Sequence, residues 1–344
     1  MKKRALVIAP GRGTYNKPEL GYLGRHHSDK NELIGEIDSF RAALGQTTIS
    51  ELDNRPAYSL KEHTRGDNAS PLIYGCAYAD FLSINRGKYD IVGVTGNSMG
   101  WYIALACAGA LSFTSALTLI NTMGGLMQDS LIGGQLIYPF IDENWQVKHD
   151  QKAELIGLID EINAQQGAQL YISIMLGGML VYGGNQNALS ALKEKLPPLD
   201  DRFPLILPNH AAFHTPLQKP IAEQAQNIFN ATMFQNPQTS LIDGRGHIWR
   251  PHACPAQDIF DYTLGHQVYE HYDFTSAVQV SVKEFAPDCL IILGPGTTLG
   301  GAVAQSLIEI NWQDIGSKAE FSARQKADPY ILAMGIDEQR SHVI

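Results

Sequence analysis

A strand–turn–helix pattern near residue 98 constrains the fold of this 344-residue chain more than any other feature. The stretch 90–95, rich in Ile and Val, leads into Gly96-Asn-Ser-Met-Gly100, and the segment 101–110 that follows is almost entirely apolar. Such runs are typical of a strand buried on both faces and of a helix packed on its sheet. The pattern G-x-S-x-G predicts a turn too tight for side chains beside the serine, which exposes the Ser98 hydroxyl. We therefore expect Ser98 to form a covalent acyl-serine; an ordinary strand–helix turn is the alternative.

Composition and charge exclude several classes of protein. A hydrophobic content of 44% with 18% charged residues is that of a globular chain, and a net charge of −9 argues against a nucleic-acid or anionic-membrane surface. No apolar run has the length of a membrane span, and residues 4–9 resemble a first strand more than a signal peptide. The four cysteines are far apart, so we expect free thiols in the cytoplasm and neither disulfides nor a metal: Cys76, Cys107, Cys254 and Cys289.

The order of predicted elements indicates an α/β frame interrupted by a compact α+β segment. Strands are expected at 4–9, 90–95, 170–175, 179–181, 203–207, 239–243 and 290–293. Helices are expected at 29–44, 70–85, 98–110, 112–128, 150–166, 187–196, 216–230 and 274–284, and from about 301. Asp29, Ser70 and Ser112 are suitable N-caps for three of these helices. The last twenty residues carry no clear pattern.

A nucleophilic serine needs a base, and one of the eleven histidines is well placed for that role. His214 follows the strand-like run 205–209, and a rigid strand end could hold the imidazole against the turn. Thr215-Pro216 is typical of the start of the next helix. His247 and His252 have no third ligand at suitable spacing, so we expect no metal there.

Five motifs in order resemble the acyltransferase family of malonyl-CoA:acyl carrier protein transacylase, which also supplies domains of polyketide and fatty-acid synthases. Pro10-Gly-Arg-Gly-Thr14 stands for P-G-Q-G-S, and Gly96-Asn-Ser-Met-Gly100 stands for G-H-S-L-G. Residues 104–111 follow the family's next helix. Ala212-Phe-His-Thr-Pro-Leu217 stands for A-F-H-S-P-L, and 294–296 match a late G-P-G.

The resemblance implies an α/β-hydrolase-like large subdomain, formed by residues 1–133 and 204–344, with an inserted ferredoxin-like α+β subdomain at 134–203. It implies a dyad in which Ser98 attacks a thioester and His214 carries the proton, with the backbone carbonyl of Gln267 orienting the imidazole. The oxyanion hole would be the backbone N–H groups of Arg12 and Met99, a pair of donors that side-chain replacement leaves intact. The Arg12 guanidinium has no family role.

The chain departs from the family in its acyl-binding residues. Members that use malonyl groups carry an arginine where this chain has Met123, and that arginine pairs with the malonyl carboxylate. The run 173–179 is also more apolar than the family's, through Met175. We expect Met123, Met175, Asn97 and Phe213 to contact the substrate. Trp101, which replaces a glutamate, is expected to pack in the core, and Arg245 and Arg250 to lie on a surface loop.

These features predict an acyl-CoA:acyl carrier protein S-acyltransferase that works by a ping-pong route through acyl-Ser98. Acyl-CoA would be the donor and the phosphopantetheine of a carrier protein the acceptor, without a bound cofactor. Met123 favours a neutral acyl group over malonyl. Two alternatives remain: an acyl-thioester hydrolase on the same scaffold, and a non-catalytic partner of the carrier protein. The family suggests a monomer, and the sequence does not identify the acyl chain, the pathway or the carrier protein.

Overall fold

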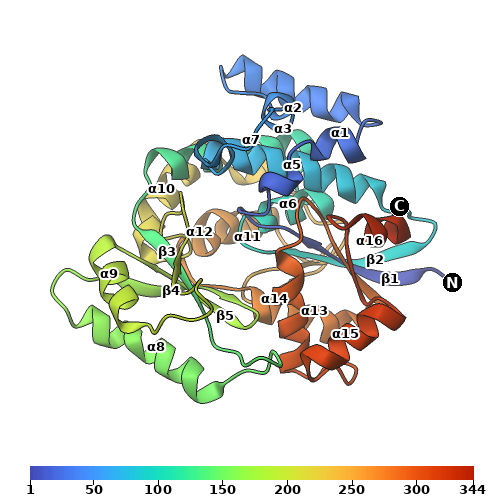
Figure 1. The fold of residues 1–344 in the computed structure, drawn as a ribbon. Coiled ribbons are helices and arrows are strands. Elements are labelled where there is room, and N and C mark those ends of the chain that lie inside the picture. Colours follow the sequence, from blue (N-terminus) through green and yellow to red (C-terminus); the bar gives the residue numbers. More distant parts are fainter.

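A mostly parallel sheet forms the centre of the larger part of the molecule (Figure 1). The computed structural model describes residues 1–344. The six strands of this sheet lie in the order β11-β10-β1-β2-β7-β8, and only β8 is antiparallel to its neighbour. Their bounds are β1 Lys3–Ala9, β2 Tyr89–Gly96, β7 Leu241–Ile242, β8 Ile248–Trp249, β10 Cys289–Ile292 and β11 Ile331–Ala333. The carboxyl ends of β1 and β2 therefore meet at one edge, where Ala9 pairs with Gly96.

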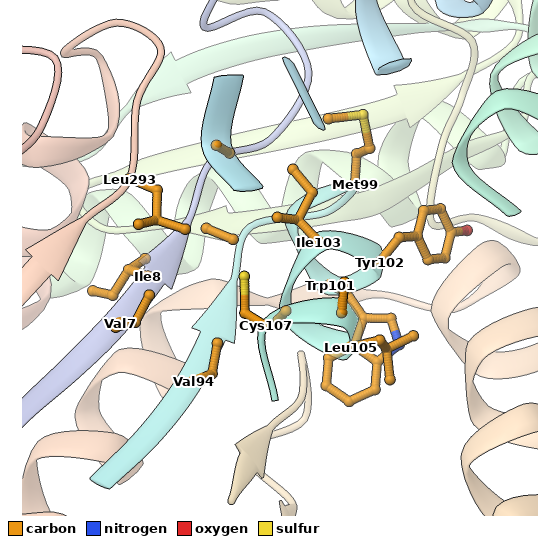
Figure 2. Packing of buried hydrophobic residues seen from close by; sticks show 14 of the residues in the cluster. Val7, Ile8, Val94, Met99, Trp101, Tyr102, Ile103, Leu105, Cys107 and Leu293 are labelled. Carbon is orange, nitrogen blue, oxygen red and sulfur yellow. The ribbon is translucent and has the colours of Figure 1, made fainter. Parts of the chain in front are cut away.

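Helices cover both faces of this sheet (Figure 1). α5 (Gly66–Ser83), α6 (Gly100–Cys107) and α7 (Phe113–Asp129) lie on one side, and α13 (Phe274–Phe285) and α14 (Leu299–Glu309) lie on the other. Residues 5–9 of β1 are completely buried, as expected for a strand packed on both faces. Figure 2 shows buried apolar side chains of β1, β2 and α6 packed near the turn.

A second sheet, with the order β6-β3-β5-β4-β9, lies beside the first. β3 (Gly134–Pro139), α8 (His149–Asn163), β4 (Leu170–Leu176), β5 (Met179–Gly184), α9 (Gln186–Lys195) and β6 (Leu205–Ile206) follow in the βαββαβ order of a ferredoxin-like unit. This confirms the predicted fold class. β9 (Tyr272–Asp273) comes from the larger part of the chain and pairs parallel to β4. The division at residues 133 and 203 remains a prediction, since β6 and β9 lie outside it.

The remaining elements are helices and single helical turns. They are η1 Lys17–Glu19, α1 Tyr22–His26, α2 Asn31–Ala43, α3 Ile49–Asp53, α4 Leu60–His63, η2 Pro216–Gln218, α10 Lys219–Ile228, η3 Ala231–Met233, α11 Ala256–Asp261, the π-helical turn η4 Tyr262–His266, α12 Gln267–Tyr269, α15 Lys318–Ala327 and α16 Asp337–Val343. The four cysteines are free and buried. None of the helices is both long and apolar enough to cross a bilayer.

One of the three helix caps predicted from local sequence is present in the structure. Ser112 caps α7 by accepting from the Ser115 N–H, as predicted. The caps predicted at Asp29 and Ser70 are wrong, because α2 begins after Lys30 and Ser70 lies buried inside α5.

Helix α5 runs through Pro71, although a proline interrupts the helical hydrogen bonds. Pro71 has no N–H to donate to the carbonyl of Asp67, four residues earlier. The Nη1 of Arg41, from α2, donates to that carbonyl instead, at 2.7 Å. A residue far along the sequence thus allows this helix to begin four residues before the predicted start.

Candidate active site

The predicted sharp turn is present between β2 and α6, with Ser98 at its apex. Ser98 has a left-handed backbone, with φ of 55°, which side-chain-bearing residues rarely adopt and which recurs at functional sites. The two flanking glycines are required by space. A Cβ on Gly96 would overlap the backbone of Gly100, and a Cβ on Gly100 would overlap the carbonyl of Ala9.

Ser98 and His214 form a hydrogen-bonded pair. The Ser98 Oγ lies 2.7 Å from the His214 Nε2. The His214 Nδ1 lies 2.6 Å from the backbone carbonyl of Gln267, which can only accept a hydrogen bond. The proton of the neutral imidazole therefore resides on Nδ1, and Nε2 presents a lone pair to the serine hydroxyl. Burial lowers the pKa of His214 to about 4, so the imidazole is neutral at pH 7.

His214 does not stand at a strand end, which corrects the expectation from sequence. The strand β6 stops at Ile206 and belongs to the second sheet, and Pro208 lacks the N–H that would continue the ladder. His214 instead lies in a turn with φ of 56°. Its backbone N–H donates to the carbonyl of Val268 at 3.1 Å, so α12 holds it.

The Gln267 side chain connects the same segment to the serine turn. Its Nε2 donates to the backbone carbonyl of Ser98 at 3.1 Å, and its Oε1 accepts from the Tyr102 hydroxyl at 2.8 Å. Tyr102 lies on the first turn of α6 and was not singled out from sequence, because a tyrosine in an apolar helix is indistinguishable from core packing. Gln267 therefore touches both members of the pair, through its carbonyl and through its amide.

The predicted oxyanion donors lie in two loops that pack together. The Asn97 N–H donates to the carbonyl of Ala9 at 3.1 Å. Gly11 lies against Asn97, since a Cβ added to Gly11 would be 2.7 Å from the carbonyl oxygen of Asn97. The backbone N–H groups of Arg12 and Met99 donate to no other group of the protein. Two unpaired donors beside the serine suit an oxyanion.

A cavity with about 800 Å³ of space between its atoms, part of it open to solvent, leads to Ser98 and His214. Of the predicted substrate contacts, Asn97, Met123 and Phe213 line it, together with Arg12 and Met99. Its other lining residues are Ser70, Tyr102, Ile120, Gly124, Met127, Gln135, Ile137, Ile174, Leu176, Val181, Leu207, His210 and Gln267. Most of the wall is therefore apolar.

Met175 does not line this cavity, so its predicted contact with substrate is wrong. Its side chain belongs to the apolar core between the second sheet and its helices. Residues alternate between the two faces of a strand, and the neighbours Ile174 and Leu176 take the cavity face. The register shift between Ile172 and Ile174 decides which face each residue takes, and the sequence pattern does not show it.

A chain of hydrogen bonds that includes two cavity-lining residues, Gln135 and His210, was not predicted from the sequence. Ser173 donates to the carbonyl of Phe213 at 2.7 Å, Gln135 donates to Ser173 at 2.6 Å, and the Gln135 Oε1 accepts from His210 Nδ1 at 2.7 Å. Burial and the nearby Arg12 hold the pKa of His210 well below its usual range. His210 is therefore neutral, with its Nε2 lone pair unpaired in the protein.

The residues of the 243–252 loop lie away from the cavity. Arg245 pairs with the buried Asp243 at 2.6 Å, and Arg250 lies 3.7 Å from Glu284. No group of three or more His, Cys, Asp or Glu side chains is arranged to hold a metal ion. Trp101 is completely buried and its indole N–H donates to Thr263 at 3.0 Å, which agrees with the packing role expected for it.

Comparison with known proteins gives a consistent result. No protein-family model matches the sequence. The malonyl CoA-acyl carrier protein transacylase of Salmonella typhimurium is 23% identical over 319 residues, which covers 92% of this chain and 97% of the relative. The chain is related to the malonyl-CoA:acyl carrier protein transacylases, as its motifs predicted.

Solved transacylase structures share the whole fold. The FabD crystal structure from Acinetobacter baumannii has a TM-score of 0.73 at 17% identity and covers 99% of this chain and 96% of its own. A malonyl-transacylase in complex with a type II PKS acyl-carrier protein has a TM-score of 0.72 at 19% identity, covering 98% and 97%. The α/β-hydrolase-like and ferredoxin-like parts therefore occur here in the transacylase arrangement.

Proposed function

We propose that this protein is an acyl-CoA:acyl carrier protein S-acyltransferase. The observation that carries the proposal is the Ser98–His214 pair, with an Oγ–Nε2 distance of 2.7 Å, at one end of a largely apolar cavity. A neutral imidazole with its lone pair on the serine hydroxyl is the arrangement needed to generate a nucleophile. The transacylase relatives support thioesters as the substrates.

The chemistry is a double displacement. In the first step the Ser98 Oγ forms a bond to the acyl carbonyl carbon while His214 Nε2 takes the hydroxyl proton. The backbone N–H groups of Arg12 and Met99 stabilise the oxyanion. The carbon–sulfur bond then breaks, and coenzyme A leaves as a thiol with the proton from His214.

The second step reverses the first with a new thiol. The phosphopantetheine thiol of a carrier protein gives its proton to His214 and its sulfur bonds to the acyl carbon, so that Ser98 leaves and recovers its proton. The malonyl-transacylase solved with an acyl-carrier protein supports this acceptor. Neither step consumes a cofactor, and four free buried thiols suit a reducing cytoplasm.

The cavity offers two different surfaces to the acyl group. Met123 is buried and lines the cavity, so an apolar wall replaces the cation that malonyl-using family members carry at this position. This wall supports a neutral acyl group there, whereas Arg12 offers a cation elsewhere in the same cavity.

The direct test is intact mass spectrometry after mixing the protein with a panel of acyl-CoA thioesters. We expect one acyl adduct on Ser98, which a holo acyl carrier protein then removes as acyl carrier protein thioester. Ser98→Ala should give no adduct while keeping the melting temperature. Loss of the adduct to water at the same rate with and without carrier protein would identify a hydrolase. An adduct that persists in Ser98→Ala would refute the proposal.

A further inference from the structure

Arg12 is the single charged side chain that lines the cavity around Ser98, because His210 and His214 are neutral there. Its guanidinium carbon lies 4.8 Å from the centre of the Phe213 ring, and its Nη2 donates to the carbonyl of Asn209. An added Cβ on Gly66 would be 2.6 Å from its Nη1, so glycine at 66 leaves room for this side chain. The guanidinium is thus held in place against the cavity wall.

The Arg12 guanidinium makes no ion pair in the protein, although the Asp67 carboxylate attracts it from a greater distance. No carboxylate lies within 4.0 Å of it, its Nη1 makes no hydrogen bond, and its Nε is buried without a partner. Burial lowers the pKa of Arg12 to about 10, so the side chain is still a cation at pH 7. A partly buried charge without an ion pair is costly, which is why such groups are normally paired.

Two buried arginines show how this protein usually satisfies such a charge. Arg340 pairs with Asp80 at 2.6 Å. Arg41 donates to the carbonyls of Thr47 and Asp67 and to two asparagine side chains. Arg12 differs from both, because its one protein acceptor is the Asn209 carbonyl and its side chain lines the cavity that contains Ser98.

We propose that Arg12 binds a carboxylate carried by the acyl group, in place of the arginine that is missing at position 123. The inference rests on the proposed acyltransferase function and specifies its substrate class as a dicarboxylic acyl thioester. A guanidinium presents parallel N–H donors that match a carboxylate. The Phe213 ring, adjacent in sequence to His214, would set the side-chain position relative to the reacting carbonyl.

The phosphate groups of coenzyme A are the other anionic groups that could reach Arg12. Malonyl-CoA and acetyl-CoA carry identical phosphates and differ only in the acyl carboxylate. Comparing the two thioesters therefore separates the sources. A change at Arg12 should lower the malonyl rate more than the acetyl rate if Arg12 pairs with the acyl carboxylate, and should lower both rates equally if Arg12 pairs with a phosphate.

The experiment measures the second-order rate of acyl-Ser98 formation with malonyl-CoA and with acetyl-CoA. In Arg12→Gln, which restores the family's side chain and keeps the backbone N–H, we expect the malonyl rate to fall tenfold or more. The ratio of the malonyl rate to the acetyl rate should fall tenfold or more, because the two thioesters share the oxyanion donors and differ only in the carboxylate. Arg12→Gln/Met123→Arg should recover malonyl transfer. Arg324→Gln, on an exposed helix, is the matched control and should change neither rate.

The outcomes separate the two proposals. An equal fall of both rates in Arg12→Gln, or a wild-type protein that reacts with acetyl-CoA and not with malonyl-CoA, would overturn the role of Arg12 while leaving the acyltransferase intact. Failure of every acyl-CoA to label Ser98 would overturn the acyltransferase itself.

Thermal unfolding measurements show whether a lower rate comes from a destabilised variant. Removing a partly buried charge that makes no ion pair should leave the melting temperature of Arg12→Gln unchanged or raised, and a purely structural arginine would lower it. Arg12→Lys retains the charge without the paired donors, and we expect an intermediate malonyl rate from it. An Arg12→Lys rate equal to that of wild type would contradict recognition through the guanidinium geometry.

Discussion

Ser98 and His214 have the same unusual backbone conformation, with φ of 55° and 56°, and their side chains meet at 2.7 Å. Each residue stands in a left-handed turn that a side chain disfavours, and each turn is held by contacts from elsewhere in the chain. The two strained backbone conformations act together: they orient the Ser98 hydroxyl and the His214 imidazole toward each other.

The acid side of the pH profile tests the state of His214. The base is active only when neutral, and burial lowers its pKa to about 4, so activity should be present above that value and fall as the pH drops through it. We expect the acylation rate of the free protein to be flat between pH 5 and pH 8. Rapid-quench measurement of coenzyme A release would show this. An acid limb centred near pH 6.5 would contradict the buried neutral imidazole.

Removal of the base should have a large and specific effect. In His214→Ala we expect the acylation rate to fall by about 10²- to 10⁴-fold, the range typical of positioned general bases. The protein should still bind acyl-CoA, since the cavity wall is otherwise unchanged. Equilibrium binding beside single-turnover acylation separates the two effects, and a variant that retains most of its acylation rate would exclude His214 as the base.

Loss of the hydrogen bond between Gln267 and Tyr102 should lower both the free energy of unfolding and the acylation rate. Gln267→Ala keeps the carbonyl that orients His214 but leaves the Tyr102 hydroxyl buried without a partner, which costs about 1–3 kcal/mol of unfolding free energy. It also frees the serine turn, and we expect a rate loss of roughly ten- to a hundredfold.

Tyr102→Phe is the matched control for this prediction, because the Gln267 amide can still donate to the carbonyl of Ser98. We expect it to lose stability while keeping most of the rate. A double-mutant cycle by urea unfolding should give a coupling of about 0.5–3 kcal/mol. Strict additivity of the two changes would refute the contact.

The glycines differ sharply in what they tolerate. The methyl group of Gly100→Ala would overlap the carbonyl oxygen of Ala9, so we expect destabilisation of about 1–3 kcal/mol and loss of acylation. Gly157 lies exposed within α8 with open space around it, and Gly157→Ala should stabilise the protein by about 0.5–1 kcal/mol. Thermal melts of the two variants give the comparison, and a shift of the same sign in both would contradict the packing of the turn.

The carboxyl-terminal helix depends on one buried ion pair. Arg340, on α16, lies 2.6 Å from Asp80 on α5, and both side chains are buried. Arg340→Met leaves Asp80 without its cation, and we expect a loss of about 3–5 kcal/mol in unfolding free energy. Arg324→Met, which breaks an exposed pair at 3.2 Å, should cost less than about 1 kcal/mol. Urea titrations measure both, and similar losses would refute the prediction.

Much of the site could be read from short segments. The serine turn, its flanking strand and helix, and the Ser112 cap each depend on residues adjacent in sequence, and the structure contains all three. The predictions of a substrate contact for Met175 and of a strand leading to His214 are wrong. A one-residue register shift reverses which face a side chain takes, and a strand needs a partner that the local sequence does not name.

The order of motifs along the chain thus predicted the similarity to the transacylases, the fold class and the sharp turn that carries Ser98, because glycine geometry and apolar periodicity are local properties. Only the folded chain decided that Gln267 and Tyr102 connect the serine turn to the histidine segment, and that the Arg12 side chain lines the cavity beside Ser98 without an ion pair. Side chains from distant segments meet there, and their charge balance exists only after packing has removed the water between them.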